Sequence, residues 1–190
     1  MLYSTYEGAV GRMIGFMVHR REKLTAAEER AKNAFFLSLN TRARKTESVV
    51  AVAIVGLVGS GKSMVAKALA ERIGAVVVEG DALRVALRKV GAASYDRARK
   101  IGEDTALQML ALGNSVIFDS DHEPLTKRAS VREKISKTNA KFIVIRIVCD
   151  PDVAIGRILQ MHYSSSPDDF WGGAKSTWTG LSKGAVVKIR

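Results

Sequence analysis

Residues 56–63 read Gly56-Leu57-Val58-Gly59-Ser60-Gly61-Lys62-Ser63, which matches the pattern G-x-x-x-x-G-K-[ST] of a phosphate-binding loop, or P-loop. Residues 49–55, directly before it, are apolar and mostly β-branched, which predicts a buried parallel strand. Residues 64–73, directly after it, are rich in helix formers and are followed by Gly74, which predicts a helix that ends there. Strand, glycine loop and helix, in this order, are the context in which the pattern binds phosphate.

The residue types of this loop suit a chain of phosphates. Glycine permits backbone angles at which successive N–H groups point inward, and the following helix adds the positive end of its dipole. A lysine reaches the β- and γ-phosphates, and the hydroxyl of the next residue is a ligand for Mg²⁺. We therefore expect a nucleotide to be bound by Gly56, Gly59, Ser60, Gly61, Lys62 and Ser63.

Composition narrows the class of protein. The chain has 190 residues, of which 47% are apolar, and a net charge of +11. A basic balance suits nucleotides and other anions. It also suits nucleic acid, but the charge is spread along the chain without a basic tail, which argues against that partner. The apolar stretch at residues 9–18 is interrupted by Arg12 and is too short for a signal peptide or a membrane span. The only cysteine is Cys149, which we expect to be a buried small hydrophobe. The lack of a second cysteine for a disulfide, together with the interrupted apolar stretch, predicts a cytoplasmic protein without a membrane contact.

Residues 1–48 are predicted to form a helical N-terminal appendage. Apolar residues recur at three- and four-residue steps between Tyr3 and Met17, as on one face of a helix. Thr25 and Glu28 form a capping box, so a second helix should begin near Ala26. Its expected buried face is Ala27, Ala31, Ala34, Phe35 and Leu39. The two helices have three alternative surfaces to pack on: the core of the same chain, which is the default, a partner such as a second copy, or a lipid surface.

Residues 49–190 are predicted to form one α/β domain. Further strands are expected at residues 75–79, 115–119 and 141–149, and helices at 82–90, 95–112, 126–137 and 151–161. The last of these helices is capped by Asp150 and begins with Pro151. Such an alternation implies a three-layer fold with a parallel sheet between helices, and ligands then bind at the carboxyl ends of the strands. Residues 162–184 hold both tryptophans and a Gly-Gly pair and are predicted to form a lid region, and residues 185–189 are a candidate short strand.

Two aspartates follow predicted strands. Asp81 comes three residues before Arg84, so the carboxylate can accept a proton from a substrate hydroxyl while the arginine holds an anionic group. The alternative is that Asp81 caps a helix and Arg84 faces solvent. Asp119 ends a predicted apolar strand, which is the position of the aspartate that holds Mg²⁺ beside a P-loop. We therefore favour a role in holding Mg²⁺, and the alternative is that Asp119 is an ordinary turn residue. Asp121 and His122 are weaker candidates in the same loop.

Three arginines on predicted helices are candidate phosphate contacts: Arg128, Arg132 and Arg157. Arg132 is favoured as an ordinary exposed residue, whereas Arg157 lies on the helix that leads into the predicted lid. The three histidines show no metal-ligand spacing, so a structural zinc site is not supported.

Taken together, residues 50–162 resemble the P-loop kinases that act on small molecules, among them zeta-toxin-like proteins, chloramphenicol phosphotransferase, gluconate kinase and adenylylsulfate kinase. The resemblance is carried by the P-loop, Gly80-Asp81-x-x-Arg84, Gly113-x-x-Val116-Ile117-x-Asp119, Arg128, Pro151 and Arg157. It differs at Asp121 and His122, where many relatives carry threonine and asparagine. It differs also at Met161, because relatives commonly carry a second lid arginine at this position. Lys175 or Lys183 is a candidate to take the role of that missing arginine.

The resemblance implies transfer of the γ-phosphate of ATP to a hydroxyl of a small molecule, with Mg²⁺ held by Ser63 and Asp119. The implied catalytic residues are Lys62, Asp81, Arg84 and Arg128, with Arg157 near the lid or the adenine. Three alternatives stay open: a zeta-toxin-like kinase of a nucleotide sugar, an ATP-binding regulatory protein without turnover that docks through its N-terminal helices, and a nucleic-acid kinase.

Overall fold

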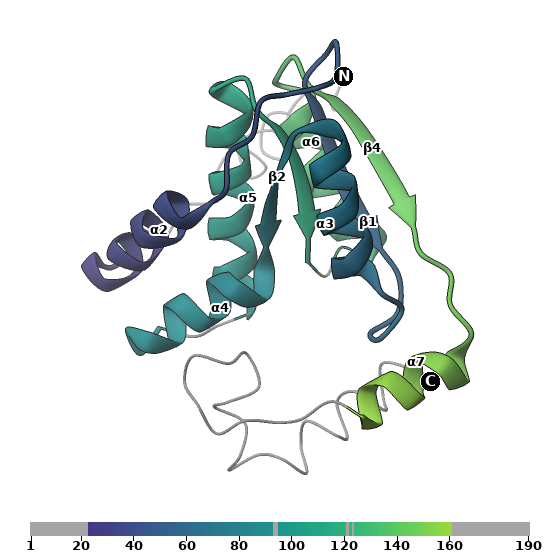
Figure 1. Ribbon diagram of the computed structural model, residues 1–190. Helices are drawn as coiled ribbons and strands as arrows, with labels where there is room; N and C mark the ends of the chain where they lie inside the picture. Colours follow the sequence, from purple (N-terminus) through teal and green to yellow (C-terminus); the bar gives the residue numbers. More distant parts are fainter. Residues whose placement is uncertain (1–22, 93–94, 121, 123, 161–190) are drawn as a thin grey trace, which may run out of the picture.

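The computed structural model describes residues 23–92, 95–120, 122 and 124–160 (Figure 1). Within these ranges, helices and strands alternate as the sequence predicts. In chain order they are α2 (Ala26–Ser38), β1 (Val50–Val55), α3 (Lys62–Ile73), β2 (Ala75–Glu79), α4 (Gly80–Lys89), α5 (Tyr95–Ala111), β3 (Ser115–Asp119), α6 (Leu125–Ile135), β4 (Lys141–Arg146) and α7 (Pro151–Leu159).

The strands form one parallel sheet in the order β2-β3-β1-β4. The two central strands, β1 and β3, are buried along their whole length, which explains why they are continuous apolar runs rather than alternating ones. The side chains of β4, by contrast, are exposed or half-buried. The predicted α/β class with a parallel sheet covered on both faces is confirmed.

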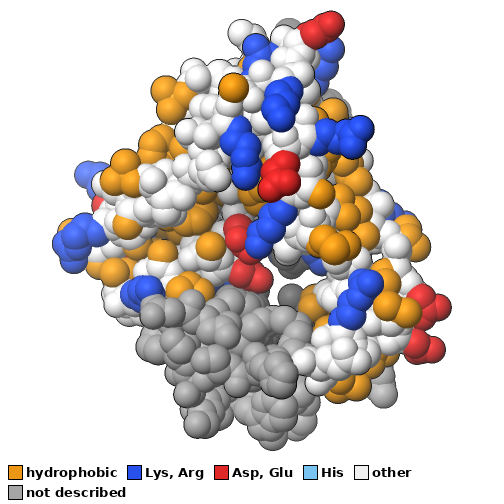
Figure 2. Space-filling model, in the orientation of Figure 1, with side chains coloured by type: hydrophobic (Ala, Val, Ile, Leu, Met, Phe, Trp, Pro, Cys, Tyr) orange, Lys and Arg blue, Asp and Glu red, His pale blue; other side chains and the backbone are white. Residues whose placement is uncertain are grey.

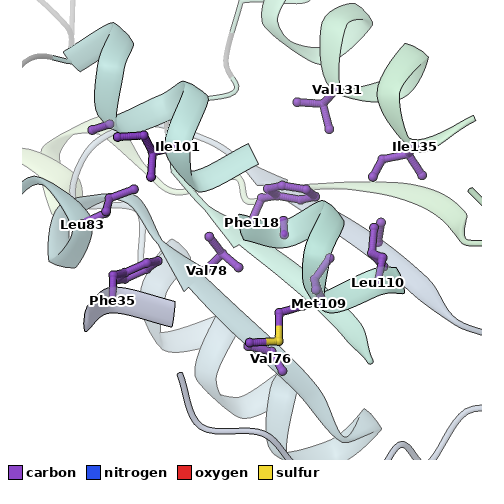
Figure 3. Close-up of a cluster of buried hydrophobic side chains, with 14 of the residues drawn as sticks. Phe35, Val76, Val78, Leu83, Ile101, Met109, Leu110, Phe118, Val131 and Ile135 are labelled. Carbon is purple, nitrogen blue, oxygen red and sulfur yellow. The ribbon is translucent and has the colours of Figure 1, made fainter. Parts of the chain in front are cut away.

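Side chains on the two faces of the sheet build two hydrophobic clusters. On one face, Val52, Ile54 and Ile117 pack against Ala66 and Ala70 of α3. On the other face, a larger cluster joins the sheet to α2, α4, α5 and α6, as Figure 3 shows. Its labelled members are Phe35, Val76, Val78, Leu83, Ile101, Met109, Leu110, Phe118, Val131 and Ile135. The helices therefore hold the sheet rigidly from both sides, and its carboxyl edge can carry a site.

Helix α2 begins where the capping box predicts. The Thr25 side chain accepts a hydrogen bond from the Glu28 backbone N–H, and the Glu28 carboxylate accepts one from the Thr25 N–H. The prediction that Ala34 is buried is wrong, because the helix turns Ala31, Phe35 and Glu28 toward the body of the molecule. This face of α2 packs on α4 and α5. For α2, this agrees with the default expectation that the appendage packs on the core of the same chain. The predicted first helix lies outside the described residues, and the domain boundary at residue 48 stays a prediction.

Some element ends differ from the predictions for identifiable reasons. Strand β4 ends at Arg146 because that residue pairs with Val55, the last residue of β1, so no partner strand remains beyond it. Helix α4 begins at Gly80, directly after β2, where a Cβ atom would lie 2.8 Å from the Ser120 Cβ. Cys149 is half-buried rather than buried. Among the helices that the structure describes, none has the length and apolar character needed to cross a bilayer.

Candidate functional site

The predicted site residues gather at the carboxyl ends of the strands. In Figure 1 the strand arrows run down toward an edge that has α4 on one side and α7 on the other. The P-loop follows β1 at this edge, Asp81 follows β2 and Asp119 ends β3. The space-filling view shows a hollow in the same region, with acidic side chains along one border (Figure 2). This is the edge at which parallel α/β sheets bind ligands.

Two glycines let the P-loop lie against its neighbours. Gly56 has a φ of 151°, and a Cβ at this position would lie 2.6 Å from the Ile147 carbonyl oxygen. Gly59 has a φ of 80°, and its Cβ would lie 2.5 Å from the carbonyl oxygen of Ala154 in α7. Both contacts are closer than real Cβ atoms tolerate. The motif glycines are therefore required by tertiary packing as well as by the backbone conformation.

The polar residues of the loop lie around its backbone. The Lys62 Nζ donates hydrogen bonds to the carbonyl oxygens of Gly56, at 2.9 Å, and Leu57, at 2.7 Å. Ser60 is buried, and its Oγ has no hydrogen-bond partner among the described residues. Ser63 is exposed in the first turn of α3. A buried orphan hydroxyl and a lysine inside a glycine cradle fit a loop built to receive an anion.

Arg157 reaches the P-loop from α7. Its Nη1 donates a hydrogen bond of 3.1 Å to the Gly59 carbonyl oxygen and lies 3.8 Å from the Cys149 Sγ. A Cβ added at Gly61 would lie 3.7 Å from the same nitrogen. The guanidinium is exposed, so it lies beside the loop where a phosphate or nucleotide base can meet it. The fold thus brings Arg157 to the P-loop, the position that its predicted role as a phosphate contact requires.

Asp119 is the buried carboxylate of the site. The residue is 7% exposed, and its Oδ2 has no hydrogen-bond partner within the described part of the chain. An orphan carboxylate oxygen beside a P-loop fits a divalent cation, which prefers oxygen ligands. Among the described residues, no group of three or more His, Cys, Asp or Glu side chains forms a metal cluster. A cation here would therefore also need ligands from Ser63, from a phosphate or from water.

Glu79 is a residue that the sequence-based site omitted. It ends β2 and lies in register with Asp119 on the neighbouring strand. Burial raises the pKa of its carboxyl above the usual range, and the charges of Asp119 and Asp81 raise it further, while Lys67 opposes them. The sequence did contain a signal that could have identified Glu79 as a site residue, namely its position at the end of a predicted strand, directly before Gly80-Asp81.

Asp81 and Arg84 form an ion pair on the first turns of α4. The Arg84 Nη2 lies 3.0 Å from the Asp81 Oδ1, and the two side chains are 13% and 50% exposed. Two alternatives are therefore wrong: the N-cap of α4 is Glu79 rather than Asp81, and the Arg84 side chain does not extend into solvent. The pairing orients the Asp81 carboxylate, and half of the surface of this side chain stays open.

Arg128 lies in the α6 layer. Its Nη1 donates a 3.0 Å hydrogen bond to the His122 carbonyl oxygen. The His122 ring is 1% exposed, packs edge-on against Phe118 and lies 3.0 Å from the Ser120 Oγ through its Nδ1. Arg128 thus contacts His122 in the stretch that follows β3, the strand that Asp119 ends. Arg132 is exposed and lies over the Phe142 ring. Asp121, Met161, Lys175, Lys183 and the predicted lid lie outside the described residues.

Comparison with known proteins agrees with this geometry. Residues 51–168, more than half of the chain, match the family model described as an AAA domain, and the chain therefore belongs to that family. This match and the parallel α/β fold agree with the predicted resemblance to P-loop kinases. No curated protein matches the chain in sequence.

Among solved structures, the chain is similar to one from the PezAT chromosomal toxin–antitoxin system of Streptococcus pneumoniae. The TM-score is 0.60 at 17% identity, over 72% of this chain and 62% of that one. The chain thus spans less than two thirds of that neighbour's length, and at this identity the likeness shows the fold alone. A sugar kinase from Janibacter sp. HTCC2649 is similar with a TM-score of 0.48 at 19% identity, over 75% of this chain and 78% of that one.

Proposed function

We propose that this protein is an ATP-dependent kinase that transfers the γ-phosphate to a hydroxyl of a small molecule. The observation that carries the proposal is the arrangement around the P-loop. Arg157 contacts the loop from α7, while Asp119 and the Asp81–Arg84 pair follow the neighbouring strands at the same edge of the sheet. Phosphoryl transfer needs positioning and charge stabilisation, and this edge combines cations for phosphate with carboxylates for a metal and an acceptor.

The nucleotide half of the reaction is assigned to the loop and α7. The P-loop N–H groups, Lys62 and Arg157 would hold the phosphates, with both cations leaving backbone carbonyl oxygens to do so. Ser63 and Asp119 would hold Mg²⁺, which supplies charge neutralisation between the β- and γ-phosphates.

The acceptor half is assigned to α4. Arg84 orients the Asp81 carboxylate, which faces the acceptor hydroxyl with its exposed half. The hydroxyl oxygen forms a bond to the γ-phosphorus while the bond from that phosphorus to the bridging oxygen breaks. The electron pair of that broken bond stays on ADP. The hydroxyl proton passes to Asp81, and Arg128 keeps the segment after Asp119 in place.

A second candidate is an ATP-binding protein without turnover. It is favoured by the ion pair between Arg84 and Asp81, because this pair engages both of the side chains that the kinase proposal assigns to the acceptor. A fluorescent ATP analogue and an ADP-release assay across a panel of sugars, nucleosides and nucleotide sugars separate the two candidates.

The Asp81→Asn variant sharpens this comparison, with Asp104→Asn, an exposed site on α5, as the matched control. For a kinase, Asp81→Asn loses transfer by about 100-fold or more and keeps nucleotide affinity, and Asp104→Asn changes neither. Nucleotide binding without transfer to any acceptor would select the second candidate.

A further inference from the structure

We propose that Glu79 is a second carboxylate of the divalent cation site and acts together with Asp119. The inference rests on the proposed function, since it concerns the cation of the same reaction. It adds a residue that neither the P-loop pattern nor the family resemblance assigned.

The sheet places the two carboxylates side by side. Glu79 and Asp119 are partners in the parallel register of β2 and β3, so their Cα atoms are neighbours at about 4.8 Å. Side chains alternate between the faces of a strand. Since Ile117 packs on the α3 face, Asp119, two residues later, points to that face as well. Val77 packs on the same face, so Glu79 shares it.

Helix α3 supplies the third side of this site. Ala66 and Ala70 of α3 pack with Ile117 and Val77, so the side of the helix that carries these alanines faces the sheet. Ser63 lies three residues before Ala66, about one turn away on the same side. The predicted hydroxyl ligand is therefore on the helix side that faces the pair of carboxylates.

Neither carboxylate is fully satisfied by the protein. Asp119 Oδ2 is buried with no hydrogen-bond partner among the residues that the structure describes. Glu79 occupies the N-cap of α4, yet its side chain makes no capping hydrogen bond. Two partly desolvated like charges repel each other, and a cation between them removes that repulsion. Mg²⁺ is commonly held through one or two carboxylates together with substrate phosphates and water, which matches this set of ligands.

The test is direct cation binding to the full chain. Mn²⁺ is titrated and followed by electron paramagnetic resonance, with and without ADP, for the wild type, Glu79→Gln and Glu79→Asp. We expect Glu79→Gln to weaken Mn²⁺ binding by about 10- to 100-fold and Glu79→Asp to restore part of it. The matched control is Glu133→Gln, at an exposed site on α6, which should bind Mn²⁺ as the wild type does.

Thermal unfolding is the second readout. Without a divalent cation, Glu79→Gln should melt at or above the wild-type temperature, because the substitution removes repulsion. The rise in melting temperature that Mg²⁺ produces in the wild type should be smaller in the variant. Two results would overturn the inference and leave the kinase proposal standing. One is a Mn²⁺ affinity of Glu79→Gln equal to that of the wild type. The other is a melting temperature of metal-free Glu79→Gln below that of the metal-free wild type. Loss of Mn²⁺ affinity in Glu79→Gln, with no transfer by the wild type, would support the cation site and reject the kinase.

Discussion

The Nη1 atom of Arg157 donates a hydrogen bond to the carbonyl oxygen of Gly59, a residue 98 positions earlier in the chain. This contact closes the P-loop against α7, the helix that directly precedes the predicted lid. It also means that the guanidinium must exchange a backbone oxygen for a phosphate oxygen when a nucleotide binds. The guanidinium is charged in both contacts, but a phosphate oxygen is charged as well and a carbonyl oxygen is not, so the contact to phosphate is the stronger and the exchange is favourable.

Arg157→Met should weaken nucleotide binding by about 10- to 100-fold, since a hydrogen bond to a charged group contributes about 1.5–3 kcal/mol. The measurement is a titration with a fluorescent ATP analogue. Arg132→Met removes an exposed arginine from α6 and serves as the matched control, with wild-type affinity expected. Equal affinities for the two variants would remove Arg157 from the nucleotide site.

Gly59→Ala should destabilise the fold by about 1–3 kcal/mol and abolish nucleotide binding, because the residue has a φ of 80° and its Cβ would lie 2.5 Å from the Ala154 carbonyl oxygen. Gly156→Ala, within α7, is the control. Its Cβ would meet no atom within 4 Å, so this substitution should be neutral or stabilise by up to about 1 kcal/mol. Urea unfolding measures both variants, and equal stabilities would contradict the packing of α7 on the loop.

Lys62→Met should lower phosphoryl transfer by about 100-fold or more while the chain stays folded. The Lys62 Nζ donates hydrogen bonds to the backbone oxygens of Gly56 and Leu57, and both residues are half-buried, so water can take the place of the ammonium group. Transfer is measured by ADP release, and Lys137→Met, at an exposed position just after α6, is expected to react as the wild type does. Transfer at the wild-type rate in Lys62→Met would rule out its catalytic role.

Glu28→Gln should destabilise the protein by about 2 kcal/mol at neutral pH. The Arg97 guanidinium donates to both carboxylate oxygens, at 2.6 and 2.7 Å, and Gln keeps the capping box but removes the charge. Glu29→Gln, exposed on the next position of α2, should have little effect. Unfolding curves at pH 7 measure the difference.

The same ion pair predicts a pH dependence. Its hydrogen bonds to Arg97 lower the pKa of Glu28 from 4.5 to about 2. Folding therefore favours the ionised carboxyl, and its contribution is present above pH 4.5 and is lost as the pH falls toward 2. The stability difference between the wild type and Glu28→Gln should shrink over this range. A constant difference down to pH 2 would show that the ion pair is not its source.

Much of the fold could be predicted from local patterns. β2 and β3 have the predicted ends, α2 begins at its capping box, and α7 begins with Pro151 after its cap Asp150, as expected. These signals act over a few residues, since periodicity, capping and glycine placement depend on near neighbours in the chain. The end of β4 depends on its partner strand β1, and there the local pattern failed. The apolar pattern predicted a strand to residue 149, whereas β4 ends at Arg146, the partner of Val55.

By itself, the sequence determined the P-loop, the alternation of strands and helices, and the candidates Asp81, Asp119 and Arg157, because each lies at a recognisable point of a local pattern. Only the tertiary structure decided which side chains meet. It pairs Arg84 with Asp81, brings Arg157 to Gly59, and sets Glu79 beside Asp119. The physical reason is that strand register and helix docking are fixed by buried apolar contacts between distant segments, and no window along the chain contains both partners.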